Sequence, residues 1–182
     1  MIREQIAHVV GSDIVEFSQL SVSDQLEAVL KLKRIFNESL PPNSAPITLD
    51  TGDGIFAIFT DTILEAMSLS EHLSRCASNE GLSLRVGIHS GPVVLREGVD
   101  GRPNAYGPGV NMAQRVMAAA SPGTPLLSSS AAEFAGSHVL WRNRLLDKGS
   151  IAVKHGVVIQ VFELTDIESP RSSFKAASTI PV

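Results

Sequence analysis

Hydrophobic residues in the first half of the chain recur at two different spacings, one typical of strands and one typical of helices. The segment from Ile6 to Phe17 is largely apolar and β-branched, with an interruption at Gly11-Ser12-Asp13, and it predicts a buried strand. Ser21 is followed three positions later by Asp24, a spacing like that of a capping box, which predicts the start of a helix. The apolar stripe expected for that helix consists of Leu26, Val29, Leu30 and Phe36.

A hairpin, a second helix and a further strand follow. Residues 47–49 and 54–59 have strand character and are separated by the tight turn Thr51-Gly52-Asp53, which predicts a hairpin. Residues 61–78 return to helical periodicity, and residues 82–89 alternate as a strand does. The order strand, helix, hairpin, helix, strand predicts an α+β fold, with a ferredoxin-like antiparallel sheet and these helices packed on one face.

The second half of the chain is less regular. Residues 97–104 are polar and contain Gly and Pro, which predicts an arm without periodic structure. A short helix is expected over residues 109–119. Further strand candidates are residues 126–127, 139–141 and 157–164. We expect one domain over residues 1–165 and a disordered tail over residues 166–182, because that tail is polar and rich in small residues.

Composition excludes several classes of function. The chain has 182 residues, is 43% apolar and carries a formal net charge of -4 without a basic run, so binding to duplex nucleic acid is not expected. The single Cys76 excludes an intrachain disulfide and a multi-cysteine zinc site. Neither a secretory signal nor a bilayer-spanning stretch is found, which predicts a cytoplasmic protein without a membrane partner.

Two aspartates stand beside strand-like apolar residues. Asp13 follows the first strand segment, and Asp53 lies in the turn of the expected hairpin. Two carboxylates delivered from neighbouring strands can hold hard divalent cations against a polyphosphate. Taken singly, each aspartate is more typical of a turn, so the interpretation depends on further motifs.

Those motifs lie in the middle of the chain. Residues 84–94 read LRVGIHSGPVV, and residues 106–116 read YGPGVNMAQRV. Together with the two aspartate stretches, in this order and spacing, they resemble the class III nucleotide cyclases. The resemblance extends from about residue 7 to about residue 164.

The resemblance implies a phosphorus–oxygen lyase that converts a nucleoside triphosphate to a 3′,5′-cyclic monophosphate and pyrophosphate. It implies two divalent cations, Mg²⁺ or Mn²⁺, both of which accept carboxylate and carbonyl oxygens. Asp13 and Asp53 match the metal-binding aspartates, and the carbonyl of Ile14 would complete the metal shell. The amides from Ile14 through Val15 and Glu16 to Phe17 would hold the β- and γ-phosphates.

The same resemblance assigns the remaining catalytic groups. Asn111 and Arg115 match the pair that positions the ribose and stabilises the transition state, and their i, i+4 spacing places both on one helix face. Lys154 lies where the family often has a phosphate-binding lysine. In this family the metal pair and the Asn/Arg pair come from different subunits, so a homodimer with sites at its interface is implied, and the arm at 97–104 would reach across it.

The base-reading positions depart from the family. Leu49 lies where the first purine-reading residue belongs, and Asn104 lies at the second. Leucine makes no polar contact, and an amide can both donate and accept, so neither purine code is present. We therefore predict a pyrimidine cyclase, similar to the short standalone enzymes of bacterial antiphage (Pycsar) systems, whose product is read by a separate effector. UTP is favoured over CTP, with Asp50 and Asn104 as the polar residues near the base.

Three alternatives remain open. The chain could be an adenylate cyclase with an atypical base pocket. It could be a non-catalytic domain that binds nucleotide or only dimerises, although such a domain has no need to keep all four metal and catalytic positions. The order of elements is also shared with ferredoxin-like domains that bind RNA or act as sensors. With 5% aromatic residues and an acidic balance, the chain is a poor candidate for RNA recognition.

Overall fold

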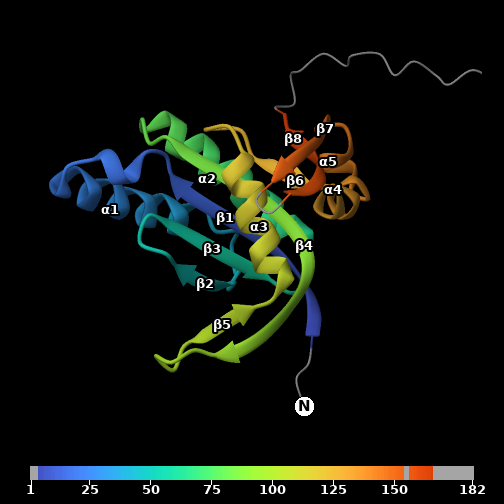
Figure 1. The fold of residues 1–182 in the computed structure, drawn as a ribbon, viewed down its shortest axis with the longest axis horizontal. Helices are drawn as coiled ribbons and strands as arrows, with labels where there is room; N and C mark the ends of the chain where they lie inside the picture. Colours follow the sequence, from blue (N-terminus) through green and yellow to red (C-terminus); the bar gives the residue numbers. More distant parts are fainter. Residues whose placement is uncertain (1–3, 154–155, 166–182) are drawn as a thin grey trace, which may run out of the picture.

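The computed structural model describes residues 4–153 and 156–165. An eight-stranded sheet runs through the molecule in the order β2-β3-β1-β4-β6-β8-β7, and β5 pairs with the far end of β4 (Figure 1). The strands are β1 (Glu4–Ile14), β2 (Ile47–Asp50), β3 (Gly54–Phe59), β4 (Leu84–Glu97), β5 (Pro103–Tyr106), β6 (Leu126–Ser128), β7 (Leu145–Val153) and β8 (Val157–Leu164). The helices are η1 (Phe17–Gln19), α1 (Val22–Ser39), α2 (Ile63–Asn79), α3 (Pro108–Ala119), α4 (Ser129–Gly136) and α5 (Val139–Arg142).

The strand pairing confirms the predicted α+β class. β1 pairs antiparallel with both β3 and β4, so it lies in the interior of the sheet. The hairpin β2–β3 forms as predicted, with Asp50 opposite Ile55. The one parallel pair among the described strands joins β4 to β6, with helix α3 in the connection between them.

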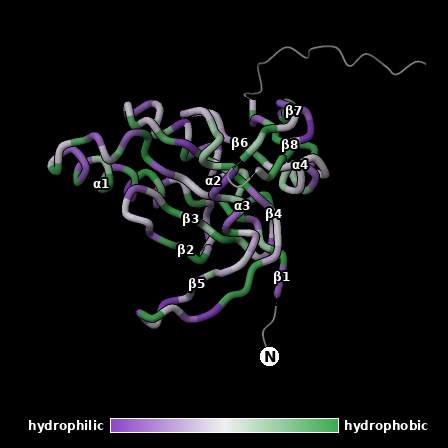
Figure 2. Tube along the Cα trace, viewed as in Figure 1, coloured by the Kyte–Doolittle hydropathy of each residue, from purple (hydrophilic) through white to green (hydrophobic). Residues whose placement is uncertain are grey.

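Helices cover both faces of the sheet. Leu32 of α1 and Met67 of α2 are buried against Val10 of β1 in the larger core. This confirms the expectation that the first two helices share a face. Helix α3 packs on the opposite face, where Ala113 and Met117 share a second core with β1, β3 and β4. In Figure 2 strand β3 is hydrophobic along its length, consistent with its burial between the two layers.

Helix α1 begins as predicted but buries only part of the predicted face. The Ser21 hydroxyl accepts a hydrogen bond from the Asp24 amide at 3.3 Å and donates one to the Asp24 carboxylate at 2.7 Å. The predicted apolar stripe is partly wrong, because Leu26 and Leu30 are 61% and 59% exposed. The buried side chains of α1 are Leu32, Ile35, Phe36 and Ser39.

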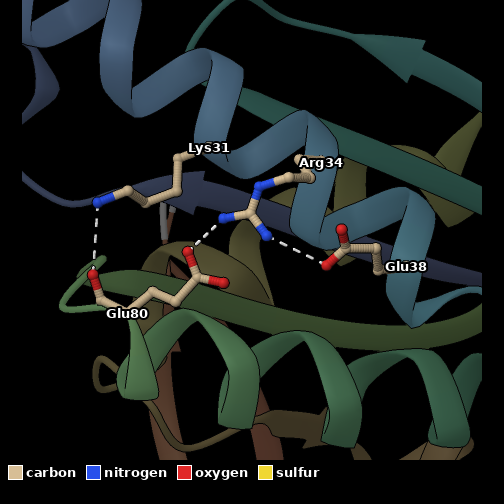
Figure 3. Close-up of polar contacts among 4 residues, drawn as sticks. All are labelled: Lys31, Arg34, Glu38 and Glu80. Atoms are coloured by element: carbon tan, nitrogen blue, oxygen red, sulfur yellow. Dashed lines mark hydrogen bonds and ion pairs between the residues drawn. The ribbon is translucent and has the colours of Figure 1, made fainter.

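Polar contacts join the ends of α1 and α2. Arg34 forms ion pairs with Glu80, just beyond α2, and with Glu38 one turn further along α1 (Figure 3). The Lys31 ammonium donates to the Glu80 carbonyl at 3.4 Å. These side chains are substantially exposed, so the pairs contribute little to stability.

Helix α3 lies directly on strand β4 because a glycine removes the side chain between them. A Cβ on Gly87 would come within 2.2 Å of the Met117 amide nitrogen, closer than any real Cβ contact. Any larger residue would therefore have to push the helix away from the sheet. The position of the helix that carries Asn111 and Arg115 thus depends on Gly87.

Several sequence-based boundaries are wrong. Residues 139–141 form the short helix α5 instead of a strand, and Trp141 packs into the larger core. The first strand ends at Ile14 and runs through Gly11-Ser12-Asp13 without a break. The stretch 97–104 is irregular only over residues 98–102, since β4 continues to Glu97 and pairs with β5 in a hairpin that projects from the body (Figure 1).

The sequence pattern also does not predict β7, α4 or the short η1. The tail expected to be disordered lies outside the described residues.

No described helix is both long and apolar enough to span a bilayer.

Candidate active site

The two candidate metal-binding aspartates lie at one end of the sheet, Asp13 near the end of β1 and Asp53 in the turn just before the adjacent strand β3. Asp13 pairs with Gly54, the residue that follows Asp53, and the Ile14 amide donates to the Asp53 carbonyl at 2.9 Å. Backbone hydrogen bonds therefore fix the spacing of the two positions. The Asp13 side chain is 14% exposed, which leaves its carboxylate in a site of low water content.

Arg85 contacts the first of these carboxylates. Its Nε donates to Asp13 Oδ1 at 2.9 Å, and its Nη2 donates to Asp13 Oδ2 at 2.5 Å, so the contact is bidentate. A third donor, Nη1, reaches the Ala118 carbonyl in the last turn of α3 at 3.4 Å. The hydrogen bond with Asp13 raises the pKa of Arg85 above its usual value, and the charges of Asp13 and Asp53 raise it further. Arg85 was not singled out from the sequence.

The turn after Asp13 has only part of the predicted phosphate-binding geometry. The amides of Ile14 and Val15 are already engaged, by the carbonyls of Asp53 and Ser83. Glu16 is exposed and has a left-handed backbone, with φ 56° and ψ 24°, and it is followed by the helical turn η1. Such a sequence of conformations directs successive N–H groups to one side, a common anion-binding arrangement. The Glu16–Phe17 portion of the turn remains the candidate for binding phosphate.

Asn111 and Arg115 share a second site on α3. Both line a cavity of about 690 Å³ together with Gln114, Ala118 and residues at the end of β7. The i, i+4 spacing thus places both side chains at one cavity, as predicted. Ala118, whose carbonyl is bonded to Arg85, belongs to the same cavity. Lys154 lies outside the described residues.

Leu49 and Asn104, the two predicted base-reading residues, line a common cavity of about 920 Å³ between β2, β5 and the end of α1. The Asn104 amide is oriented by its neighbours. Its Oδ1 accepts from the Ala105 amide at 2.7 Å, and its Nδ2 donates to the Tyr106 hydroxyl at 3.2 Å. The second N–H of Nδ2 remains available to a ligand.

Asp50 lines the same cavity, but its carboxylate is bonded within the protein. The Lys33 ammonium lies 2.6 Å from Oδ2, and the Gly52 amide donates to Oδ1 at 2.9 Å. The hydrogen bond with Lys33 lowers the pKa of Asp50, and the Gly52 amide lowers it further. Asp50 alternates with Leu49 along β2 and therefore points to the other face of the strand. Its carboxylate is thus already engaged by Lys33 and Gly52, and its role beside the base stays a prediction.

The residues present suit hard divalent cations. Asp13 and Asp53 supply carboxylate oxygens, the ligand type that these cations prefer. Arg85 pairs with Asp13 in the free protein, so a cation would have to compete with its charge. The described residues contain no group of three or more His, Cys, Asp or Glu arranged to hold a metal. A two-carboxylate site of this kind suits Mg²⁺ or Mn²⁺, which commonly take the rest of their ligands from substrate phosphates and water.

A separate polar network lies away from these carboxylates, under α4. His89 Nδ1 lies 2.8 Å from the Ser128 hydroxyl, and His8 Nδ1 lies 2.8 Å from the Ser90 hydroxyl. Burial lowers the pKa of His89 to about 4 and also lowers the pKa of His8. Burial therefore favours the neutral form of both histidines, and each is hydrogen-bonded to a serine hydroxyl.

Comparison with known families is decisive for the class of domain. The sequence matches the family described as "Adenylate and Guanylate cyclase catalytic domain" over residues 54–162, more than half of the chain. The chain belongs to this family. The predicted cyclase catalytic domain is thereby confirmed at the level of the family.

A curated relative of this cyclase-family chain is "Putative adenylate cyclase 3" of Rhizobium meliloti (strain 1021). The two are 25% identical over 144 residues, which is 73% of this chain and 24% of that protein. The chain therefore spans about a quarter of the length of the relative it matches.

Solved cyclase structures have the same fold. The adenylyl cyclase CyaB from P. aeruginosa superposes with a TM-score of 0.73 at 20% identity, covering 96% of this chain and 100% of that one. The guanylyl cyclase Cya2 gives a TM-score of 0.75 at 17% identity, covering 94% and 97%. The guanylate cyclase domain of RhGC from Catenaria anguillulae, in complex with GTP, gives 0.72 at 19% identity, covering 90% and 98%. At these identities the likeness supports the fold alone.

Proposed function

We propose that the chain is a nucleotide cyclase that converts a nucleoside triphosphate to a 3′,5′-cyclic monophosphate and pyrophosphate. The ribose 3′ oxygen forms a bond to the α-phosphorus and loses its proton, while the bond from the α-phosphorus to the oxygen bridging to the β-phosphate breaks. The proposal depends on one observation in a chain of the cyclase family: backbone hydrogen bonds hold Asp13, near the end of β1, beside Asp53, in the turn just before β3.

The roles of the residues follow from their chemistry. Asp13 and Asp53, with the Ile14 carbonyl, would hold two divalent cations, which lower the pKa of the attacking hydroxyl and neutralise phosphate charge. Arg115 stays charged and offers a planar fork of donors suited to phosphate oxygens. Asn111 lines the same cavity and can orient the ribose by donating and accepting. The Glu16–Phe17 turn and Lys154 are proposed contacts for the terminal phosphates.

We further propose that two copies of the chain build each site, one supplying the carboxylates and the other Asn111 and Arg115. Two features support this arrangement. The β4–β5 hairpin projects from the body of the molecule (Figure 1), where it could contact a second copy. A guanylyl cyclase domain from Blastocladiella emersonii with the same fold is described as a non-canonical dimer, with a TM-score of 0.71, so domains of this fold can self-associate.

The proposed base is a pyrimidine, with UTP preferred. The cavity containing Leu49 and Asn104 presents an apolar side chain and an amide whose oxygen already accepts the Ala105 amide. The amide therefore presents mainly a donor, which suits a carbonyl oxygen such as O4 of uracil and not the amino group of cytosine or adenine. A product made from UTP would be a messenger for a separate effector, as in bacterial antiphage systems.

One experiment tests the reaction and the base together. Purified protein is incubated with an equimolar mixture of ATP, GTP, CTP and UTP and Mn²⁺, and the cyclic products are identified by mass spectrometry. Cyclic UMP as the main product, absent with Asp53→Asn, is the expected result. Mainly cyclic AMP or cyclic GMP would refute the pyrimidine assignment, and the absence of any cyclic product would refute the cyclase.

An adenylate cyclase is the second candidate, and one observation favours it. The curated relative is named as a putative adenylate cyclase, at 25% identity. In that case Asn104 would accept from the adenine amino group, using the second lone pair of its Oδ1. The competition experiment separates the two candidates directly.

A further inference from the structure

The contact between Arg85 and Asp13 has a consequence for metal binding. The guanidinium holds both oxygens of the carboxylate, at 2.9 Å and 2.5 Å. Both side chains are largely shielded from water, with 32% of Arg85 and 14% of Asp13 exposed. A charge-assisted bidentate pair in such a place is among the stronger polar contacts in proteins.

The position of Arg85 makes it a direct competitor of a cation. Strand pairing places Asp13 opposite Arg85 in adjacent strands, so the carboxylate is always within reach of the guanidinium. The charge of Asp53 also acts on Arg85. A metal ion entering between the two aspartates would have to replace the hydrogen bonds of Arg85 and tolerate a second positive charge close by.

The third bond of Arg85 defines where the side chain rests. Nη1 donates to the Ala118 carbonyl at the C-terminal turn of α3, where the helix dipole favours a cation. Arg85 therefore has a second anchor beside Asp13, on the wall of the cavity that holds Asn111 and Arg115. The guanidinium can keep this anchor while it gives up the carboxylate.

We propose that Arg85 acts as an internal counter-cation that occupies Asp13 in the free protein and must be displaced before a divalent cation binds there. Metal binding to the free protein is consequently weak. It strengthens when a polyanion offers the displaced guanidinium a new partner, since a guanidinium binds phosphate oxygens as well as it binds a carboxylate. Occupation of the metal site is thereby linked to the arrival of the substrate.

The proposal rests on the proposed function only in placing the metal at Asp13. Its test uses the metal alone, without turnover. Mn²⁺ is titrated into the full-length protein, and the free hydrated ion is measured by electron paramagnetic resonance. Arg85→Ala should lower the Kd for Mn²⁺ by about tenfold or more, because both the competing hydrogen bonds and the repelling charge are gone. In the double variant Arg85→Ala/Asp13→Asn, this gain in Mn²⁺ affinity should disappear.

A matched control separates the local effect from the change in net charge. Arg34 also forms ion pairs with two carboxylates, but on the outer side of α1 and α2 (Figure 3). Arg34→Ala removes the same charge and should leave the Kd within about twofold of the original protein, because the exposed charge is screened. Equal Kd values for Arg85→Ala and Arg34→Ala, or weaker binding by Arg85→Ala, would overturn the proposal.

A second variant keeps the test decisive if Arg85→Ala does not fold. Arg85→Lys retains the charge but loses the fork of donors, and should give a Kd between those of the original protein and Arg85→Ala. An unchanged Kd for Arg85→Lys would contradict the account. Failure of the proposed function looks different: Mn²⁺ affinity would respond to Arg85 while no cyclic nucleotide formed with any triphosphate.

Discussion

The carboxylate end of the proposed site and the proposed base cavity are built in different ways. Asp13 and Asp53 are held by β1, β3 and β4 in the interior of the sheet, with backbone hydrogen bonds and a bidentate ion pair. The base cavity lies between β2 and β5, each of which pairs with one other strand. There the pair formed by Lys33 and Asp50 is 46% and 52% exposed.

The residues proposed for the reaction and those proposed to select the substrate therefore lie in regions of the sheet that are built differently. Groups that must keep a fixed geometry are placed on paired central strands, where strand register determines their spacing. Groups that contact the base are placed at an edge, where a side chain can change without disturbing the core. By the sequence resemblance, the positions predicted to read the base depart from the family, whereas those predicted to bind metal and act in catalysis do not.

The largest expected effect comes from mixing two variants that each damage one half of the site. Asp53→Asn removes a metal ligand and Arg115→Ala removes a catalytic donor, so each alone should lose at least a hundredfold in activity. If two copies share each site, an equimolar mixture should recover about a quarter of the original activity, because half of the dimers are mixed and each has one intact site. Activity is measured as cyclic product formed with Mn²⁺.

A mixture that stays inactive, while the unaltered protein is active, would show that one copy holds the whole site. The sharing of the site between two chains would then be wrong, although the cyclase itself would stand.

Gly87→Ala should destabilise the interior of the sheet by displacing α3. The new Cβ would lie 2.2 Å from the Met117 amide nitrogen, so helix and strand must separate. We expect a loss of about 3 kcal/mol in the free energy of unfolding and a fall in Tm of roughly 6–12 °C, measured by thermal unfolding.

Gly136→Ala is the matched control, because the nearest atom to its added Cβ is 4.0 Å away. If Gly87→Ala unfolds at the same temperature as Gly136→Ala, the close contact between α3 and β4 does not support the site as described.

Asn104→Asp should change base preference at the edge without affecting the fold. The substitution replaces the free N–H donor by an acceptor, so kcat/KM for UTP should fall about tenfold relative to CTP. Asn37→Asp, which lines the same cavity, introduces the same charge without touching the Asn104 amide. If both variants give a similar ratio of kcat/KM for UTP to kcat/KM for CTP, Asn104 does not select the base.

Stability of the interior should fall as the pH is lowered, because of His89. Burial lowers its pKa to about 4 in the folded protein, from a usual value of 6.5. Between these values the unfolded chain binds a proton that the folded chain does not, so the free energy of unfolding decreases as pH falls from 6.5 towards 4.

Urea unfolding at several pH values measures this dependence. In His89→Gln the free energy of unfolding should depend less steeply on pH. Part of the dependence should remain, because the pKa of His8 is also lowered. An equally steep dependence in His89→Gln would show that other groups cause it.

The sequence predicted those features that depend on neighbouring residues. The Ser21 cap, the hairpin turn at Thr51-Gly52-Asp53 and the pairing of Asn111 with Arg115 on one helix face are local, and the structure contains all three. The stripe through Leu26 and Leu30 was wrong, because the apolar face of α1 that is buried depends on how the helix docks on the sheet.

The features that the sequence did not predict depend on partners distant in the chain. Arg85 stands in an apolar strand, which was the only available signal of a special role. Its contact with Asp13 follows from the register of β1 with β4, which no local pattern contains. Residues 139–141 look like a strand in the sequence, because three apolar residues are too few to distinguish a helical from a strand period. No local pattern shows that Lys33 of α1 pairs with the Asp50 carboxylate.

The central claim, a metal-dependent cyclase built on Asp13 and Asp53, is tested most directly by the stoichiometry of its products. The protein is incubated with UTP and Mn²⁺, and cyclic UMP and pyrophosphate are quantified by phosphorus NMR, beside Asp53→Asn. The account predicts equal amounts of the two products and the loss of both in the variant. Release of orthophosphate in place of pyrophosphate, or equal turnover by Asp53→Asn, would contradict it.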